Sequence, residues 1–408
     1  MADNKDKKVL NVPALRFPEF TEEWEEHYLA EYLDFKNGLN PSANKFGSGI
    51  KFISVMDILN NDFITYDCIR TSVEITPEEQ VAFAVEKGDM LFQRSSETLE
   101  DVGRANVYMD DRPAVFGGFV IRGKKKAEYN PMFFRYLLAS PYARKKVIPM
   151  GAGAQHFNIG QDGLSKVKLH FPILQEQQKI ADLLRLINER ISTQNKIIED
   201  LKKLKSAISK HLFARKDLLE TTICLSNIAT LKNGYAFQSS KYNALGKWKI
   251  LTITNVSGER YINDEDCNCI INLPNDIQDH QVLKEGDILI SLTGNVGRVS
   301  LCKNGNYLLN QRVGLLQLAK NVNQEFLYQI LSSQRFENSM IACGQGAAQM
   351  NIGKGDVENY VLPYSSNGNN ILFAAKILHS YDECIINELR RLTLLTMQKQ
   401  YLLTQMFI

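Results

Sequence analysis

The chain has 408 residues, of which 44% are hydrophobic and 23% charged, and its formal net charge is +2. This composition excludes a disordered or fibrous protein and leaves room for two or three globular domains. Apolar runs stay shorter than the 18 residues of a membrane-spanning helix, and the N-terminus lacks the apolar core of a signal peptide. We therefore expect a cytoplasmic protein without a membrane partner. The seven cysteines form no paired C-x-x-C framework, which favours reduced thiols.

In chain order, residues 1–26 predict an N-terminal arm, because two prolines keep this segment extended. Residues 27–172 combine short apolar runs, such as Lys51 to Leu59 and Asp89 to Gln93, with Gly and Asn turns and a helical patch after Pro131. This mixture predicts an α+β domain with several short strands.

Residues 173–216 predict one long helix. Apolar side chains recur there at steps of three and four and form the seam of a coiled coil: Ile180, Leu184, Ile187, Ile191, Ile198, Leu201 and Ile208. At about 1.5 Å per residue, a helix of about 37 residues spans about 55 Å. Such a helix cannot bury its apolar stripe alone, so the seam predicts a partner helix.

Residues 217–364 repeat the first domain, and residues 365–408 repeat the long helix. Lys36-Asn37-Gly38 returns as Lys232-Asn233-Gly234, and Asn158-Ile-Gly160 returns as Asn351-Ile-Gly353. The second helix carries the same seam at Leu378, Ile385, Leu392, Leu395 and Leu402. This order predicts a tandem duplication of a domain followed by a helix. The two helices are expected to pair, and their sequences leave parallel and antiparallel pairing open.

The two halves differ in their polar loops. Phe116 to Phe119 aligns with Asn310 to Val313, and the segment from Arg94 to Asp101 is longer than its counterpart between Ser291 and Asn295. Two domains of one fold with different loops would suit the recognition of two different targets.

The motifs of common catalytic sites are absent from the sequence. There is no G-x-x-x-x-G-K-[ST] phosphate loop, no H-E-x-x-H, and no methyltransferase tetrapeptide of Asn or Asp, Pro, Pro and an aromatic. Phe46-Gly-Ser-Gly49 resembles a nucleotide loop, but it neither follows a clear strand nor opens a helix. The six histidines have no spacing suited to a metal or a general base. We therefore predict a chain with no catalytic residue and no metal site.

Polar residues in the loops are candidates for DNA contacts. Arg, Asn and Gln supply paired donors and acceptors for base edges, whereas Lys mostly contacts phosphates. The first half offers Lys36, Asn37, Arg94, Arg104, Lys124 and Gln155, with Arg122 beside Lys124. The second half offers Lys232, Asn233, Thr293, Asn295, Arg298, Gln311, Arg312 and Gln349. Arg104 and Arg298 follow a glycine in both halves and are predicted to anchor phosphates.

The sequence resembles the specificity (S) subunit of a type I restriction–modification system. The resemblance rests on Leu15-Arg-Phe-Pro-Glu-Phe20 with Glu23-Trp24-Glu25, on the order domain–helix–domain–helix, and on Asn-Ile-Gly before each helix. Pro172-Ile-Leu-Gln-Glu-Gln177 is similar to the family's lead-in to the first helix. The second copy, Tyr364 to Asn370, departs from it because it has no Glu-Gln.

The resemblance implies an α+β fold with two target-recognition domains, 27–172 and 217–364. Two spacer helices, 173–216 and 365–408, would form an antiparallel coiled coil with pseudo-twofold symmetry. Each domain would read one half of a split, asymmetric site in double-stranded DNA, and the helices would set the gap.

Methyltransferase (M) subunits would bind the helices and carry S-adenosylmethionine, and restriction (R) subunits would use ATP and Mg. No cofactor is expected in this chain itself. An alternative function is a two-headed DNA-binding regulatory protein that acts without enzyme partners. A stand-alone methyltransferase or nuclease is disfavoured by the missing motifs.

Overall fold

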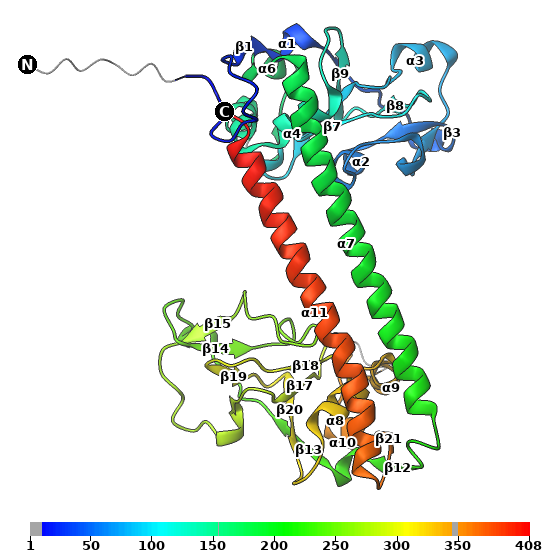
Figure 1. The fold of residues 1–408 in the computed structure, drawn as a ribbon, viewed down its shortest axis with the longest axis vertical. Helices are drawn as coiled ribbons and strands as arrows, with labels where there is room; N and C mark the ends of the chain where they lie inside the picture. The colour runs from blue at the N-terminus through cyan, green and yellow to red at the C-terminus, as the bar shows by residue number, and fades with distance from the viewer. Residues whose placement is uncertain (1–9, 154, 345–349) are drawn as a thin grey trace, which may run out of the picture. The chain divides into compact units, whose positions relative to one another are not determined.

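The computed structural model describes residues 10–153, 155–344 and 350–408 (Figure 1). Its contacts divide the chain into two compact units, one up to Asn195 together with Arg391–Ile408, the other Lys196–Arg390. The long helices α7 (Leu174–Ala214) and α11 (Gly368–Gln405) each contribute one part to each unit. Each unit therefore holds a β-rich domain and the helix segments that belong to it. Within the described part of the chain, no helix is both long and apolar enough to cross a membrane.

The first unit is built around a four-stranded antiparallel sheet. Its strands lie in the order β2 (Leu33–Asn37), β9 (Val120–Lys125), β5 (Met90–Gln93) and β7 (Ala105–Val107). The central strand β5 is buried along its whole length, as its apolar run requires. Helices α4 (Pro131–Ala139) and α5 (Pro141–Val147) add the aromatic and aliphatic side chains that complete the core. The helical patch predicted after Pro131 is thus confirmed.

Smaller elements surround this sheet. Strand β3 (Phe46–Ile53) pairs antiparallel with β4 (Ser72–Val73) and parallel with β8 (Val115–Phe116). The remaining strand pairs are β1 (Glu25–Tyr28) with β11 (Lys168–Phe171) and β6 (Ser95–Ser96) with β10 (Phe157–Asn158). The short helices are α1 (Leu29–Tyr32), α2 (Val55–Asn60), α3 (Pro77–Ala82) and α6 (Gln161–Ser165).

The apolar run from Lys51 to Leu59 is divided between two elements, the end of β3 and helix α2. Ser54 ends the strand because its backbone N–H and its hydroxyl both donate to the Asp57 carboxylate at 2.7 Å, a capping arrangement that starts α2. Phe46-Gly-Ser-Gly49 lies inside β3.

The second unit repeats the main sheet and the principal helices of the first. Its main sheet has the order β13 (Ala229–Asn233), β20 (Val313–Leu318), β17 (Ile288–Ser291) and β18 (Val299–Leu301). Strand β14 (Trp248–Leu251) pairs parallel with β19 (Tyr307–Leu309), as β3 does with β8. The other strands and helices are β12 (Thr221–Cys224), β21 (Val361–Tyr364), β15 (Asn268–Ile270), β16 (Val282–Leu283), α8 (Gln324–Leu331), α9 (Gln334–Gly344) and α10 (Lys354–Glu358). The internal repeat is confirmed as a repeat of the fold.

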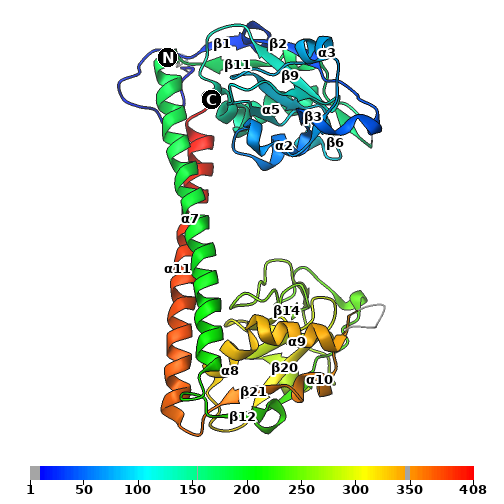
Figure 2. The same cartoon turned by 90° about the vertical axis from the view of Figure 1, so that its right-hand side faces the viewer.

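Within each unit, α7 and α11 run antiparallel. In the first unit, Ile180 and Leu184 near the start of α7 share one core with Leu402 and Met406 at the end of α11 (Figures 1 and 2). In the second unit, Leu212 at the end of α7 shares a core with residues near the start of α11, namely Ile371, Ala374 and Leu378. The pairing that the sequence left open is therefore antiparallel.

The predicted seam lies along this pairing. Seven of its members are buried: Ile180, Leu184, Ile187, Ile198, Leu378, Ile385 and Leu402. The others are half-buried: Ile191, Leu201, Ile208, Leu392 and Leu395. The stripe is therefore shielded unevenly, with most of its burial where a β-rich domain also covers the helices.

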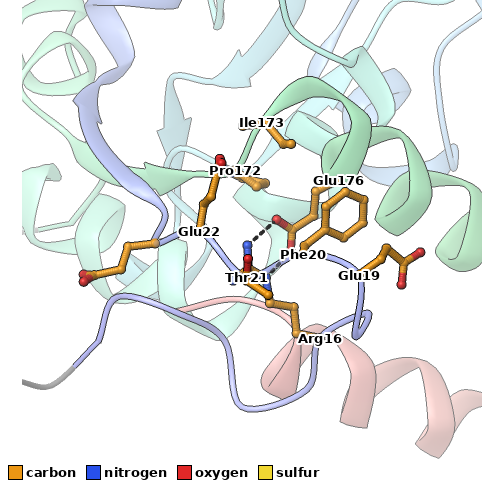
Figure 3. A pocket seen from close by; sticks show the side chains of 9 residues that line it. Arg16, Glu19, Phe20, Thr21, Glu22, Pro172, Ile173 and Glu176 are labelled. Carbon is orange, nitrogen blue, oxygen red and sulfur yellow. Dashed lines mark hydrogen bonds and ion pairs between the residues drawn. The ribbon is translucent and has the colours of Figure 1, made fainter.

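The N-terminal segment of the first unit contacts the start of α7 and the end of α11. Arg16 donates two hydrogen bonds of 2.7 Å to the carboxylate of Glu176, which is fully buried (Figure 3). The backbone N–H of Leu15 donates to Gln405 O at 2.9 Å, and Trp24 packs edge-on against Phe407. The pocket beside this ion pair measures about 100 Å³, which is small for a ligand site. The N-terminal motif and the lead-in to the first long helix, which both carry the family resemblance, therefore meet here and have a structural role.

Candidate nucleic-acid interface

The antiparallel sheet gathers loop residues at one of its ends. In the first unit, β2 and β5 end where β9 and β7 begin, because neighbouring strands run in opposite directions. Lys36 and Asn37 close β2, Arg94 follows β5, and Arg104 precedes β7. The topology thus brings four predicted residues to the same end of the sheet.

Backbone hydrogen bonds fix these loops. Arg94 N donates to Phe119 O at 2.9 Å, and Arg94 O accepts from Ile159 N at 2.9 Å. Gln93 N donates to Arg104 O at 2.8 Å, and Gln93 O accepts from Gly103 N at 2.9 Å. We call this set of four bonds the sheet-end frame.

The second unit has the same frame. The matching bonds, between 2.9 and 3.1 Å, are Leu292 N to Arg312 O, Ile352 N to Leu292 O, Ser291 N to Arg298 O, and Gly297 N to Ser291 O. The frame therefore pairs Arg104 with Arg298, Arg94 with Leu292, and Phe119 with Arg312.

This pairing corrects the alignment of one loop. The sequence alignment matched Phe119 with Val313, whereas the strand register matches Val120 with Val313, since Asn37 lies opposite Ile121 and Asn233 opposite Gly314. The alignment is wrong by one residue because nothing in the loop sequences themselves marks the register.

The Asn-Ile-Gly motif of each half closes the frame. Each isoleucine, Ile159 and Ile352, is buried. The hydroxyl of Thr293 donates to Asn351 Oδ1 at 3.1 Å, and the hydroxyl of Ser95 donates to Asn158 in the same way. The repeated motif is thus explained by support of the loops, and Thr293 takes part in that support.

The two arginines kept in both halves are partly exposed, and each pairs with one carboxylate. Arg104 pairs with Asp101 at 2.5 Å and Arg298 with Glu337 at 3.5 Å, and their side chains are 54% and 39% exposed. A guanidinium has five N–H donors, so each keeps donors for a phosphate.

Other predicted residues of the sheet end also face solvent. Asn233, Asn295, Gln311, Arg312 and Gln155 are exposed. Asn37 and Lys232 are half-buried, and Gln349 lies outside the described residues. Arg94 is half-buried and its Nη1 donates to Gly118 O at 3.2 Å, which ties it to the loop before β9.

Three basic residues predicted in the first half either lie away from this end of the sheet or already contact other groups of their domain. Lys124 lies at the opposite end of β9, where it pairs with Glu86 at 3.2 Å. Lys36 donates to Ala82 O at 2.8 Å and lies over the ring of Phe83. Arg122 was placed in a loop, and this is wrong: it is a buried residue of β9 and donates to Ala84 O.

Side-chain contacts from α5 hold the long loop of the first half. Arg144 in α5 donates to Val102 O at 2.6 Å and to Glu100 O at 2.8 Å. Burial lowers the pKa of the Arg144 guanidinium to about 10, so it stays charged at neutral pH. Arg144 therefore fixes the turn that carries Asp101 beside Arg104.

One exposed residue of the sheet end, Phe119, was not among the residues predicted to contact DNA. Phe119 is 67% exposed although it lies between the buried strands β8 and β9. Only polar residues were sought in the loops, and the signal was the pair Gly117-Gly118 before an aromatic residue. Among residues 10–153, 155–344 and 350–408, no group of three His, Cys, Asp or Glu side chains is arranged to hold a metal ion.

Comparison with known proteins identifies the family. The model of the type I restriction modification DNA specificity domain matches residues 21–203 and again residues 220–396. The chain belongs to this family. The resemblance drawn from the sequence is thereby confirmed, and the two matches account for the two recognition domains.

Relatives and solved structures agree with this assignment. The type I restriction enzyme MjaVIII specificity subunit of Methanocaldococcus jannaschii is 23% identical over 361 residues, which cover 82% of this chain and 80% of that protein. The S subunit of a type I restriction–modification system from M. genitalium has a TM-score of 0.57 at 17% identity, covering 97% of this chain and 99% of that one. A chain from a study of complex assembly and conformational transition of the type I R-M system gives 0.58 at 14% identity, covering 93% and 96%. The two structures share the fold.

Proposed function

We propose that this specificity subunit recognises a split DNA site, with each recognition domain contacting one half through its sheet end. The observation that carries the proposal is the sheet-end frame, which is the same in both domains and presents different exposed side chains. A common frame fixes how each domain meets the duplex, and different side chains select different bases.

The polar residues of the two sheet ends have two different roles in DNA binding. Arg104 and Arg298, at matching places in the frame, contact phosphates and supply salt-sensitive affinity. Asn37, Gln155, Asn233, Asn295, Gln311 and Arg312 are the candidates for contacts with base edges. Because Lys36 and Lys124 already have partners within their domain, their contribution to binding is smaller.

Catalysis belongs to other subunits in this proposal. Methyltransferase subunits supply S-adenosylmethionine chemistry, restriction subunits supply ATP- and Mg-dependent cleavage, and this chain carries no cofactor. The helix pair offers a docking place in the first unit, a groove of about 550 Å³ lined by Leu186, Thr193, Leu394 and Leu395 among others. Leu186 and Leu394 are 51% and 64% exposed, so the groove offers apolar surface that a partner would bury.

Mixing the purified subunits tests the proposal. This chain, a methyltransferase subunit of a type I system from the same host and their mixture are each incubated with S-adenosylmethionine and host DNA lacking the modification. We expect sequence-specific methylation only in the mixture. DNA binding by this chain without any methylation in the mixture would favour the stand-alone regulatory protein.

A further inference from the structure

The sheet-end frame places Phe119 of the first domain and Arg312 of the second at one and the same backbone position. Each carbonyl accepts the matching hydrogen bond, from Arg94 N at 2.9 Å and from Leu292 N at 3.1 Å. Both side chains are exposed, and Phe119 is 67% exposed. The two halves therefore present a phenyl ring and a guanidinium at equivalent positions.

The loop that carries Phe119 is held tightly, so its exposure is not a result of slack packing. A Cβ added to Gly117 would lie 2.7 Å from the Phe52 ring, and one added to Gly118 would lie 1.9 Å from Asn40 Oδ1. Arg94 Nη1 also donates to Gly118 O. Both residues of strand β8, which precedes the loop, are buried. The fold thus positions an apolar ring at a site surrounded by polar groups.

The chemistry of the two side chains points to different bases. In the major groove, thymine is distinguished by its C5-methyl group, which apolar side chains contact, whereas guanine offers O6 and N7 to an arginine. Charge is placed differently as well. At one frame position, the first domain has Arg94, whose guanidinium is tied to the loop. The second domain has the apolar, buried Leu292 at the matching position.

We propose that Phe119 and Arg312 are matching specificity-determining residues, with Phe119 contacting a thymine methyl in the first half-site and Arg312 a guanine in the second. This assignment rests on the proposed function. It adds one base-selecting side chain for each sheet end and the kind of base that this side chain contacts.

The test compares the methylated motifs produced by complexes of the methyltransferase subunit with wild-type chain, Phe119→Ala or Arg312→Ala. We expect Phe119→Ala to lose the preference for one thymine in one half-site, by about tenfold or more, and to leave the other half-site unchanged. We expect Arg312→Ala to lose the preference for one guanine in the other half-site and to leave the first half-site unchanged. Val81→Ala is the matched control, because Val81 is an 80% exposed apolar residue in α3 of the same domain.

A chemical substitution in the DNA tests the contact itself. Replacing that thymine by deoxyuridine removes only the methyl group, so it should weaken binding by the wild-type complex and have little effect on Phe119→Ala. Phe119→Leu should keep the thymine preference in part. The inference is overturned if the wild-type complex methylates its motif and Phe119→Ala methylates the same motif, or if deoxyuridine is tolerated by the wild type. Absence of methylation by the wild-type mixture would instead count against the proposed function.

Discussion

At the scale of single residues, Gly38 and Gly234, a glycine pair kept in both halves, mark close contacts between backbones. A Cβ on Gly38 would lie 2.1 Å from Gly117 O, and a Cβ on Gly234 would lie 2.1 Å from Asn310 O. In both cases the residue after the glycine forms a parallel bridge to the loop before β9 or β20. The sequence shows that both halves keep this glycine, and the structure shows which contact excludes a side chain.

Gly38→Ala should therefore destabilise the first unit by about 1–3 kcal/mol, because a backbone carbonyl cannot move aside as a side chain would. Trp24 lies in the first unit and Trp248 in the second, so urea unfolding followed by fluorescence in a Trp248→Phe background reports the first unit. Gly160→Ala is the control, since no atom lies within 4 Å of its added Cβ and φ is −101°. Equal midpoints for the two variants would contradict the close contact.

A second residue-scale feature is the carboxylate of Asp264 in the second unit. Lys249 lies 2.7 Å from it and Lys303 3.0 Å, and Tyr307 donates to it at 3.0 Å. The Lys249 ammonium, with smaller contributions from Lys303 and Tyr307, lowers the pKa of Asp264 below its ordinary value. The folded state thus prefers the ionised carboxylate.

The stabilisation by Asp264 should be complete above its unfolded pKa of about 3.9 and be lost as the pH falls toward the lowered value. Asp264→Asn should cost about 2 kcal/mol at neutral pH and make the second unit less sensitive to acid below pH 5. Urea midpoints measured from pH 3 to 7 check this, with Asp266→Asn, an exposed neighbour, as the control. A constant difference between Asp264→Asn and wild type across this range would contradict the ion pairs.

At the scale of elements, the two units attach their domains to the long helices by different chemistry. In the second unit, Asp382 of α11 lies 2.9 Å from Arg260 Nη1 and 2.5 Å from Lys205 Nζ of α7, and all three are largely buried. At the matching place in the first unit, Asn188 donates to the hydroxyl of Tyr136 at 3.0 Å. One attachment is charged and the other is neutral.

Asp382→Ala should cost the second unit about 3 kcal/mol or more, because it leaves two buried cations without this partner. Asn188→Ala should cost the first unit only about 1 kcal/mol, since a single neutral hydrogen bond is lost. Thermal unfolding of the full chain, with the two transitions assigned by amide exchange, measures both. Similar losses for the two variants would show that the charged network adds nothing.

The sequence revealed the elements whose signal is local or repeated. The seam predicted both long helices and Pro131 predicted α4, because the signal of each lies within one stretch of chain. Contacts between distant segments left no such signal: Arg260 and Asp382 are 122 residues apart, and neither belongs to the seam. Strand register is also set by the partner strand, which is why the loop before β9 was aligned one residue away from its true match.

At the scale of the whole molecule, duplication and family were visible in the sequence, while the interface needed the fold. Arg94, Arg104 and Phe119 are separated along the chain and meet only because β5, β7 and β9 share one end of a sheet. The same topology removed Lys124 from the group. Residue type alone could not separate a loop arginine from the buried Arg122, since burial depends on the paired strand.

We propose that the two recognition domains read two half-sites and that the helix pair sets the gap between them. This proposal is tested most directly by adding four residues after Thr193 in α7 and four before Arg391 in α11, which lengthens both helices by about 6 Å and introduces a stutter, a local unwinding, into the seam. The measurement is the motif methylated by the variant complex, determined by sequencing modified bases. We predict the two half-sites of the wild type, with the gap longer by about two base pairs at roughly 3.4 Å each. An unchanged gap, or a motif without a gap, would contradict the account.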